Sequence, residues 1–64
     1  MHNIVASKKV QEGIVVMWDE NGQIKYDTIN FQDLIDTKVN ALDLLERPAA
    51  YRIDTKAHKV VPKA

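Results

Sequence analysis

The sequence predicts a small α+β domain in which one helix packs on one face of a small antiparallel sheet. The expected order of elements is strand, strand, strand, helix, strand, strand. Three observations lead to this prediction: a hairpin signal before residue 23, a helical stripe of apolar residues after residue 30, and a second hairpin signal near the end of the chain. The 64 residues leave room for one domain, covering residues 1–64.

The clearest local signal is a β-hairpin over residues 13–28. A strand-forming run lies on each side of Asp19-Glu20-Asn21-Gly22, and Asp, Asn and Gly are typical turn residues. A further short strand is expected upstream at residues 2–7, with residues 8–12 as the connection.

Two turn types compete in this hairpin, and each sets a different strand register. A three-residue loop with a bulge at Gly22 would pair Trp18 with Ile24 and Val16 with Tyr26, so that these apolar residues share one face. A two-residue loop would divide them between the two faces. We therefore predict the three-residue loop.

This register leaves a second set of apolar side chains on the other face of the sheet. Val15, Met17 and Ile29 would form an apolar strip there. Contiguous apolar surface is either covered or used for binding. We expect this strip to bind another protein or a second copy of the chain.

The middle of the chain, from residue 30 to residue 47, is predicted to be helical. Asn30 is a suitable N-cap, and Asp33 places negative charge at the positive end of the helix dipole. Apolar residues recur at three- and four-residue spacing, and Pro48 marks the end of the helix.

The helical pattern has one interruption. Lys38 falls on the apolar stripe, and Asp36-Thr37 is a suitable cap for a second, shorter helix. One bent helix is the first interpretation, and two short helices are the alternative.

The C-terminal segment predicts a second hairpin, with its turn at residues 55–58. Asp54 can accept backbone N–H groups of this turn, and His58 tolerates the left-handed conformation that the turn requires. Pairing Ile53 with Val60 places the apolar residues of both strands on one face.

Composition excludes several classes of protein. Hydrophobic residues make up 45% of the chain, charged residues 28%, and the formal net charge is zero, which argues against a disordered tail and against nucleic-acid binding by bulk charge. The chain has no cysteine, hence no disulfide framework and no thiol nucleophile. No run approaches the roughly 20 apolar residues of a membrane helix, and no signal peptide follows Met1. We expect a complete cytoplasmic protein without membrane association.

No catalytic, cofactor-binding or metal-binding residue is predicted. His2 and His58 are the side chains best suited to acid–base chemistry, but they lack the spacing of a chelating pair. Ser7 has no nucleophile elbow around it, and two glycines cannot form a phosphate-binding loop. We therefore expect a protein that is not an enzyme and that holds no cofactor and no metal.

Charge is unevenly distributed along the chain. Residues 11–46 carry a net charge of −6, and the segments before and after them carry +2 and +4. The simplest interpretation is that the charges balance within the fold and keep it soluble. A second is an acidic helix face that docks on a basic partner, formed by Asp33, Asp36 and Asp43. A third is a basic track along a phosphate backbone, formed by Lys8, Lys9, Arg52, Lys56, Lys59 and Lys63.

These observations favour a small interaction protein that binds and modulates or inhibits another protein. A homodimer is also expected, because so short a chain often requires a partner for stability. The alternative is a nucleic-acid-binding accessory protein that uses the basic C-terminal hairpin.

Overall fold

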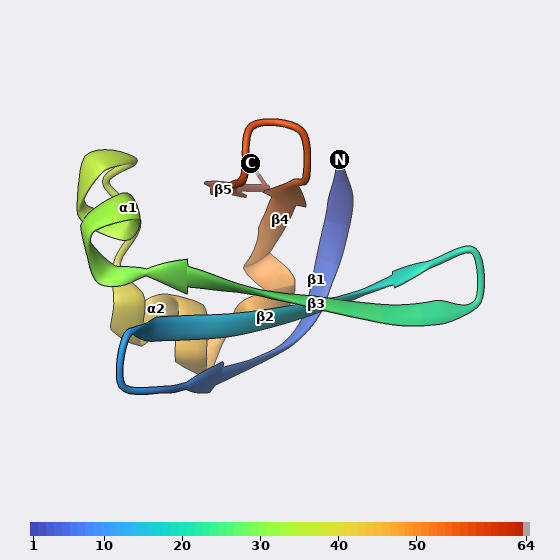
Figure 1. Cartoon of the computed structure of the whole chain (residues 1–64), viewed down its shortest axis with the longest axis horizontal. Helices are drawn as coiled ribbons and strands as arrows, with labels where there is room; N and C mark the ends of the chain where they lie inside the picture. Colours follow the sequence, from blue (N-terminus) through green and yellow to red (C-terminus); the bar gives the residue numbers. More distant parts are fainter. Residues whose placement is uncertain (64) are drawn as a thin grey trace.

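Five antiparallel strands and two short helices make up the part of the chain that the computed structural model describes, residues 1–63 (Figure 1). The elements are β1 (His2–Lys9), β2 (Gly13–Glu20), β3 (Gln23–Asn30), α1 (Phe31–Asp36), α2 (Ala41–Glu46), the 3-10 turn Pro48–Ala50, β4 (Tyr51–Asp54) and β5 (Lys59–Pro62). In the sheet the strand order is β3-β2-β1-β4-β5, so that β1 is central and β3 and β5 form the two edges.

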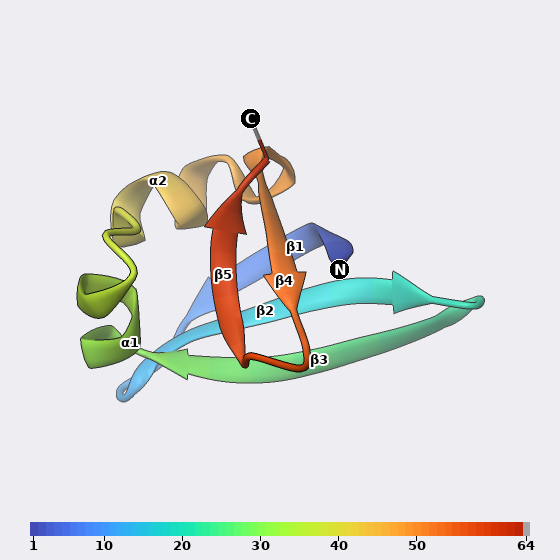
Figure 2. The same ribbon diagram turned by 90° about the horizontal axis from the view of Figure 1, so that it is seen from above.

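The sheet is strongly curled, because β1 pairs with different strands along its length. Its first residues, His2 and Asn3, pair with β4, whereas its residues from Ile4 onward pair with β2. The register with β2 shifts between Ile4 and Ala6, and a β-bulge of this kind bends a strand and increases its twist. As a result, the β4–β5 hairpin crosses over one face of the β2–β3 hairpin, as Figures 1 and 2 show from two directions.

The hydrophobic core lies between the two hairpins, and α1 and α2 lie at one end of the molecule (Figure 2). The predicted α+β class is confirmed, but the predicted packing of a helix on one face of the sheet is wrong, because the β4–β5 hairpin covers that face. Every strand and both helices contribute to the core. The core side chains are those of Ile4, Ile14, Val16, Trp18, Ile29, Leu34, Val39, Leu44, Tyr51, Ile53 and Val60.

Two histidine–carboxylate pairs connect different strands and turns of the fold. His58 Nε2, in the β4–β5 turn, lies 2.8 Å from Asp27 Oδ2 on β3. His2 Nε2, at the start of β1, lies 3.1 Å from Glu20 Oε1 at the end of β2. The His2 ring also stacks on the ring of Trp18, with 6.5 Å between centroids. The His58–Asp27 contact therefore joins the two hairpins, whereas the His2–Glu20 contact joins the neighbouring strands β1 and β2.

The first strand and the C-terminal hairpin lie where the sequence predicts them, although β1 continues to Lys9. Ile53 pairs with Val60 as predicted. Asp54 Oδ1 accepts two backbone N–H groups of the turn, both at 3.1 Å. His58 adopts the expected left-handed conformation, with φ of 54°.

The prediction of a single bent helix is wrong, and the alternative of two short helices is correct. The chain leaves the helical path after Thr37, where Lys38 adopts a φ of 60°. The Lys38 N–H donates to the Ile35 carbonyl and the Val39 N–H donates to the Leu34 carbonyl. This pattern is the Schellman motif, which ends helices at a left-handed residue. Lys38 interrupts the apolar stripe because it occupies that terminating position.

Both helices are capped by asparagine. Asn30 Oδ1 accepts the Asp33 N–H at 2.7 Å, which confirms the predicted cap of α1. Asn40 Oδ1 accepts the Asp43 N–H at 3.1 Å at the start of α2. The predicted second cap at Asp36-Thr37 is therefore wrong, since these residues end α1.

The register of β2 with β3 also differs from the prediction. Glu20 pairs with Gln23, so the loop consists only of Asn21 and Gly22, with φ of 56° and 84°. Positive φ at both positions is the signature of a type I′ turn, whose twist matches that of the flanking strands. Asp19 Oδ1 accepts the Gly22 N–H at 2.9 Å and supports the turn. The prediction of a three-residue loop rests on the assumption that the apolar residues of both strands share one face. In the structure they do not, because Ile24 and Tyr26 lie on the outer face.

The corrected register moves Ile29 from the surface to the core. It pairs with Ile14, and its side chain is only 1% exposed, so the prediction that it joins Val15 and Met17 on an outer strip is wrong. Ile24 and Tyr26, which the predicted register places in the core, face outward instead.

The start of the β2–β3 ladder depends on a glycine. A Cβ atom at Gly13 would lie 2.0 Å from the backbone oxygen of Ile29, a distance that no side chain can occupy. Gly22 differs, because its φ of +84° disfavours a side chain but no atom lies within 4 Å of the position of a Cβ.

We predict that Gly13→Ala destabilises the protein by about 3 kcal/mol, because the new methyl group forces the β2 and β3 backbones apart. The control is Gly22→Ala, which requires only an unfavourable φ and is expected to cost about 1 kcal/mol. Urea denaturation of the two variants and the wild type measures both values. A smaller loss for Gly13→Ala than for Gly22→Ala would contradict the packing described here.

Candidate functional site

β2 is apolar on both of its faces. Ile14, Val16 and Trp18 point into the core and are buried, whereas Val15 and Met17 point to the outer side and are half-buried. A strand that is apolar on both faces is typical of sheets that are covered on both faces. Only the inner face of this hairpin is covered by the chain itself (Figure 2).

β3 has the reverse of the usual alternation for a sheet with one solvated face. Ile24 and Tyr26 face outward and are 64% and 70% exposed. Lys25 and Asp27 lie on the inner side, opposite Trp18 and Val16 of β2. Complete burial of one such isoleucine side chain is worth about 1.5–3 kcal/mol. Because most of the Ile24 side chain stays exposed after folding, most of this free energy can be gained only when a partner covers it.

These strands and β1 form a contiguous apolar surface, which we call the outer patch. Met17 is at its centre, between Ala6 on β1 and Tyr26 on β3. A shallow hollow of about 270 Å³ lies on it, lined by Val15, Tyr26, Asp27 and Thr28. The outer patch consists of Ala6, Val15, Met17, Ile24 and Tyr26.

Sequence reasoning found two members of the outer patch, Val15 and Met17, and missed the two most exposed ones, Ile24 and Tyr26. The signal that locates them is the Asn21-Gly22 dipeptide, which is the strongest short-range indicator of a two-residue hairpin loop. With that loop, the pairing places Tyr26 opposite Met17.

The three predicted acidic positions do not form one helix face, because they lie on two helices. Asp33 lies in the first turn of α1 beneath the Asn30 cap, and Asp36 Oδ1 accepts a hydrogen bond from Gln32 Nε2 at 3.0 Å. Asp43 lies on α2 and is engaged by other groups of the chain. The acidic positions that the sequence suggested for docking are therefore contributed by α1 and by α2.

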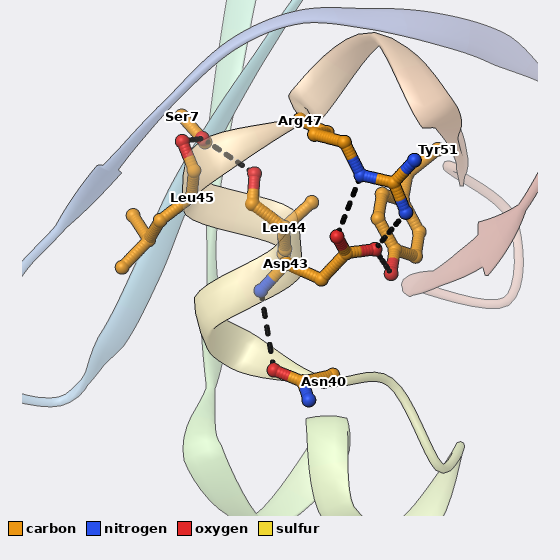
Figure 3. Close-up of polar contacts among 7 residues, drawn as sticks. All are labelled: Ser7, Asn40, Asp43, Leu44, Leu45, Arg47 and Tyr51. Carbon is orange, nitrogen blue, oxygen red and sulfur yellow. Dashed lines mark hydrogen bonds and ion pairs between the residues drawn. The ribbon is translucent and has the colours of Figure 1, made fainter.

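Asp43 is the centre of a polar cluster (Figure 3). Its carboxylate accepts hydrogen bonds from Arg47 Nε and Arg47 Nη2 at 2.7 and 2.9 Å, and from the Tyr51 hydroxyl at 2.5 Å. Nearby, Ser7 Oγ donates to the Leu44 carbonyl at 2.8 Å. These contacts connect α2 to β4 and to β1.

The cluster shifts the protonation equilibria of its members. Hydrogen bonds from Arg47 and Tyr51 lower the pKa of Asp43 below its ordinary value. The hydrogen bond to Asp43 raises the pKa of Tyr51 and also that of Arg47. Asp43 is thus a weaker base and Tyr51 a weaker acid than usual. General acid–base catalysis near neutral pH is favoured by shifts in the opposite direction.

The six predicted basic residues lie on several elements of the fold. Arg52 lies next to β1, where its Nε donates to Asn3 Oδ1 at 3.1 Å. Lys8 lies opposite Val15 on β2. It is five residues beyond Asn3 along β1, which corresponds to roughly 17 Å. The other positions are dispersed over β1, the β4–β5 turn, β5 and the residue after it: Lys9, Lys56, Lys59 and Lys63.

Within residues 1–63, no three His, Asp or Glu side chains lie together in a way that could hold a metal ion. No helix in this range has the length and apolar character that crossing a bilayer requires. Comparison of the chain with protein-family models, with curated proteins and with solved structures finds no match.

The polar cluster makes stability depend on pH. Because the pKa of Asp43 is lowered in the folded state, its contribution is present at neutral pH and is lost as the pH falls from about 4 toward the lower folded pKa. We predict that Asp43→Asn is less stable than the wild type at pH 7 and that the difference shrinks below pH 4. Urea denaturation between pH 7 and pH 2 measures this.

The matched control is Asp33→Asn, which removes the same charge from the third residue of α1 beneath the Asn30 cap, just as Asp43 is the third residue of α2 beneath the Asn40 cap. It is expected to change stability less at pH 7. Equal losses for the two variants would show that the cluster contributes nothing beyond its charge.

Proposed function

We propose that the protein is a non-enzymatic interaction protein that binds another protein through the outer patch and modulates or inhibits it. The observation that carries this proposal is the reversed alternation of β3. The strand exposes Ile24 and Tyr26 and directs Lys25 and Asp27 to the inner side. This arrangement does not serve folding, because the apolar side chains remain in water.

The composition of the outer patch supports a protein as the partner. Tyrosine and methionine are enriched in the centres of protein interfaces, and Tyr26 pairs with Met17 at the centre of this surface. Charged residues border it: Lys8 lies opposite Val15, and Asp19 lies opposite Ile24. An apolar centre with a polar rim is the usual anatomy of a protein–protein interface.

The shape of the surface also favours a macromolecule over a small ligand. The hollow beside Tyr26 measures about 270 Å³ and is shallow. Sites for small molecules are clefts of roughly 300–1,000 Å³ that enclose most of the ligand. A shallow, partly apolar surface is better matched by the surface of another protein.

Nucleic-acid binding is the second candidate, and one observation favours it. Tyr26 is 70% exposed on the same side of the sheet as Lys8, and an exposed aromatic ring beside a cation can stack on a base. The dispersion of the other basic residues makes this candidate the weaker one.

We predict that Met17→Asp abolishes partner binding, because a carboxylate at the centre of the outer patch must be desolvated when a partner covers it. The measurement is capture of binding proteins from a lysate of the source cells by the immobilised wild type and variant, read by mass spectrometry. Circular dichroism and thermal unfolding confirm that the variant is folded.

The matched control is Leu42→Asp, the same type of substitution at a 70% exposed residue on α2. It is expected to retain binding. Loss of binding with Leu42→Asp but not with Met17→Asp would move the site to the helices and refute the proposal. Binding of single-stranded oligonucleotides that weakens steeply with salt, and is lost in Lys8→Glu, would favour the second candidate.

A further inference from the structure

β3 is a long, unpaired edge of the sheet. It contains eight residues, whereas β5 at the other edge contains four. Its residues 23–26 are all exposed. A long open edge presents unpaired N–H and C=O groups to which another strand can add.

The hairpin register shows which backbone groups point to the open side. In a two-residue hairpin the residues that flank the turn, Glu20 and Gln23, direct their N–H and C=O groups at each other, and the direction alternates from there. Ile24, Tyr26 and Thr28 therefore direct theirs away from β2. The Thr28 N–H agrees with this, since it donates to Asp27 Oδ1 at 2.8 Å.

We propose that β3 pairs antiparallel with β3 of a second copy of the chain, about a two-fold axis at Tyr26. The sheets of the two copies then form one continuous sheet of ten strands. This proposal uses the strand edge and does not depend on the proposed function of the outer patch.

Charge complementarity selects this register. With Tyr26 opposite Tyr26 of the second copy, Lys25 lies opposite Asp27, and by symmetry Asp27 lies opposite Lys25. A shift that centres the axis on Lys25 or on Asp27 would place two like charges opposite each other. Opposite charges across antiparallel strands stabilise the pair and like charges destabilise it.

The hydrogen bond between Asp27 and Thr28 can rearrange to allow this pairing. Upon pairing, the Thr28 N–H donates to the Ile24 carbonyl of the second copy instead of to Asp27 Oδ1. Asp27 Oδ1 can then accept a hydrogen bond from Lys25 of the second copy. Asp27 Oδ2 remains at His58 Nε2, 2.8 Å away. The Asp27 side chain is 44% exposed, so a second cation can reach it.

The outer side of the same pairing joins apolar surfaces. Tyr26 meets Tyr26, and Ile24 lies opposite Thr28 of the second copy, so that the outer patches of the two copies become adjacent. An edge-to-edge contact buries less surface than a standard interface, and we expect a dissociation constant in the micromolar range.

Charge reversal tests the proposal. Sedimentation equilibrium from about 1 μM to about 1 mM is expected to show a wild-type dimer, with Lys25→Glu and Asp27→Lys each dissociating at least about tenfold more readily. Mixing the two variants is expected to restore dimers. The new glutamate of one chain then lies opposite the new lysine of the other, and the unchanged Asp27 of the first chain lies opposite the unchanged Lys25 of the second. Met17→Asp, which lies outside the edge, is expected to dimerise normally.

Three outcomes would overturn the proposal: a wild type that remains monomeric at about 1 mM, a dimer that Lys25→Glu does not weaken, or folded variants that do not associate when mixed. Because Asp27→Lys also removes the contact with His58, a second measurement uses the wild type alone. Amide resonances of Ile24, Tyr26 and Thr28 are expected to shift with concentration, and shifts confined to other residues would place the interface elsewhere.

Discussion

The turn at Asn21-Gly22 is the constraint on which the rest of the structure depends. Its two positive φ values set the register of β2 with β3, and in a strand a shift of one residue exchanges the two faces. This register places Ile29 in the core and directs Ile24 and Tyr26 to the outside. The same turn also determines which backbone groups of β3 remain free at the edge.

The chain uses its inner surface almost completely for folding. The bulge in β1 curls the sheet, and the two hairpins then bury the core between them. Polar contacts between different elements accompany this arrangement, notably His58 with Asp27 and Tyr51 with Asp43. The outer side of β2 and β3 and the edge of β3 take no part in it. Apolar contact and strand pairing are therefore available to these strands for recognition.

Local signals in the sequence predict local structure well. The Asn30 cap, the left-handed His58 and the pairing of Ile53 with Val60 all follow from residue type and spacing. The errors concern choices between two local solutions. The apolar stripe predicts a helix that continues through Lys38, although Lys38 ends α1 in the structure. The predicted register of β2 with β3 places Ile29 on the surface, because it gives the clustering of apolar residues more weight than the geometry of the turn. The outer patch is predicted only in part for the same reason.

Cross-strand nuclear Overhauser effects between Hα protons test the register most directly. In antiparallel sheets the closest Cα atoms belong to the pairs without mutual hydrogen bonds. The structure predicts strong contacts between Met17 and Tyr26 and between Asp19 and Ile24. Contacts between Val16 and Tyr26 instead would require the three-residue loop and would return Tyr26 to the core side, which contradicts the assignment of the outer patch and of the free edge.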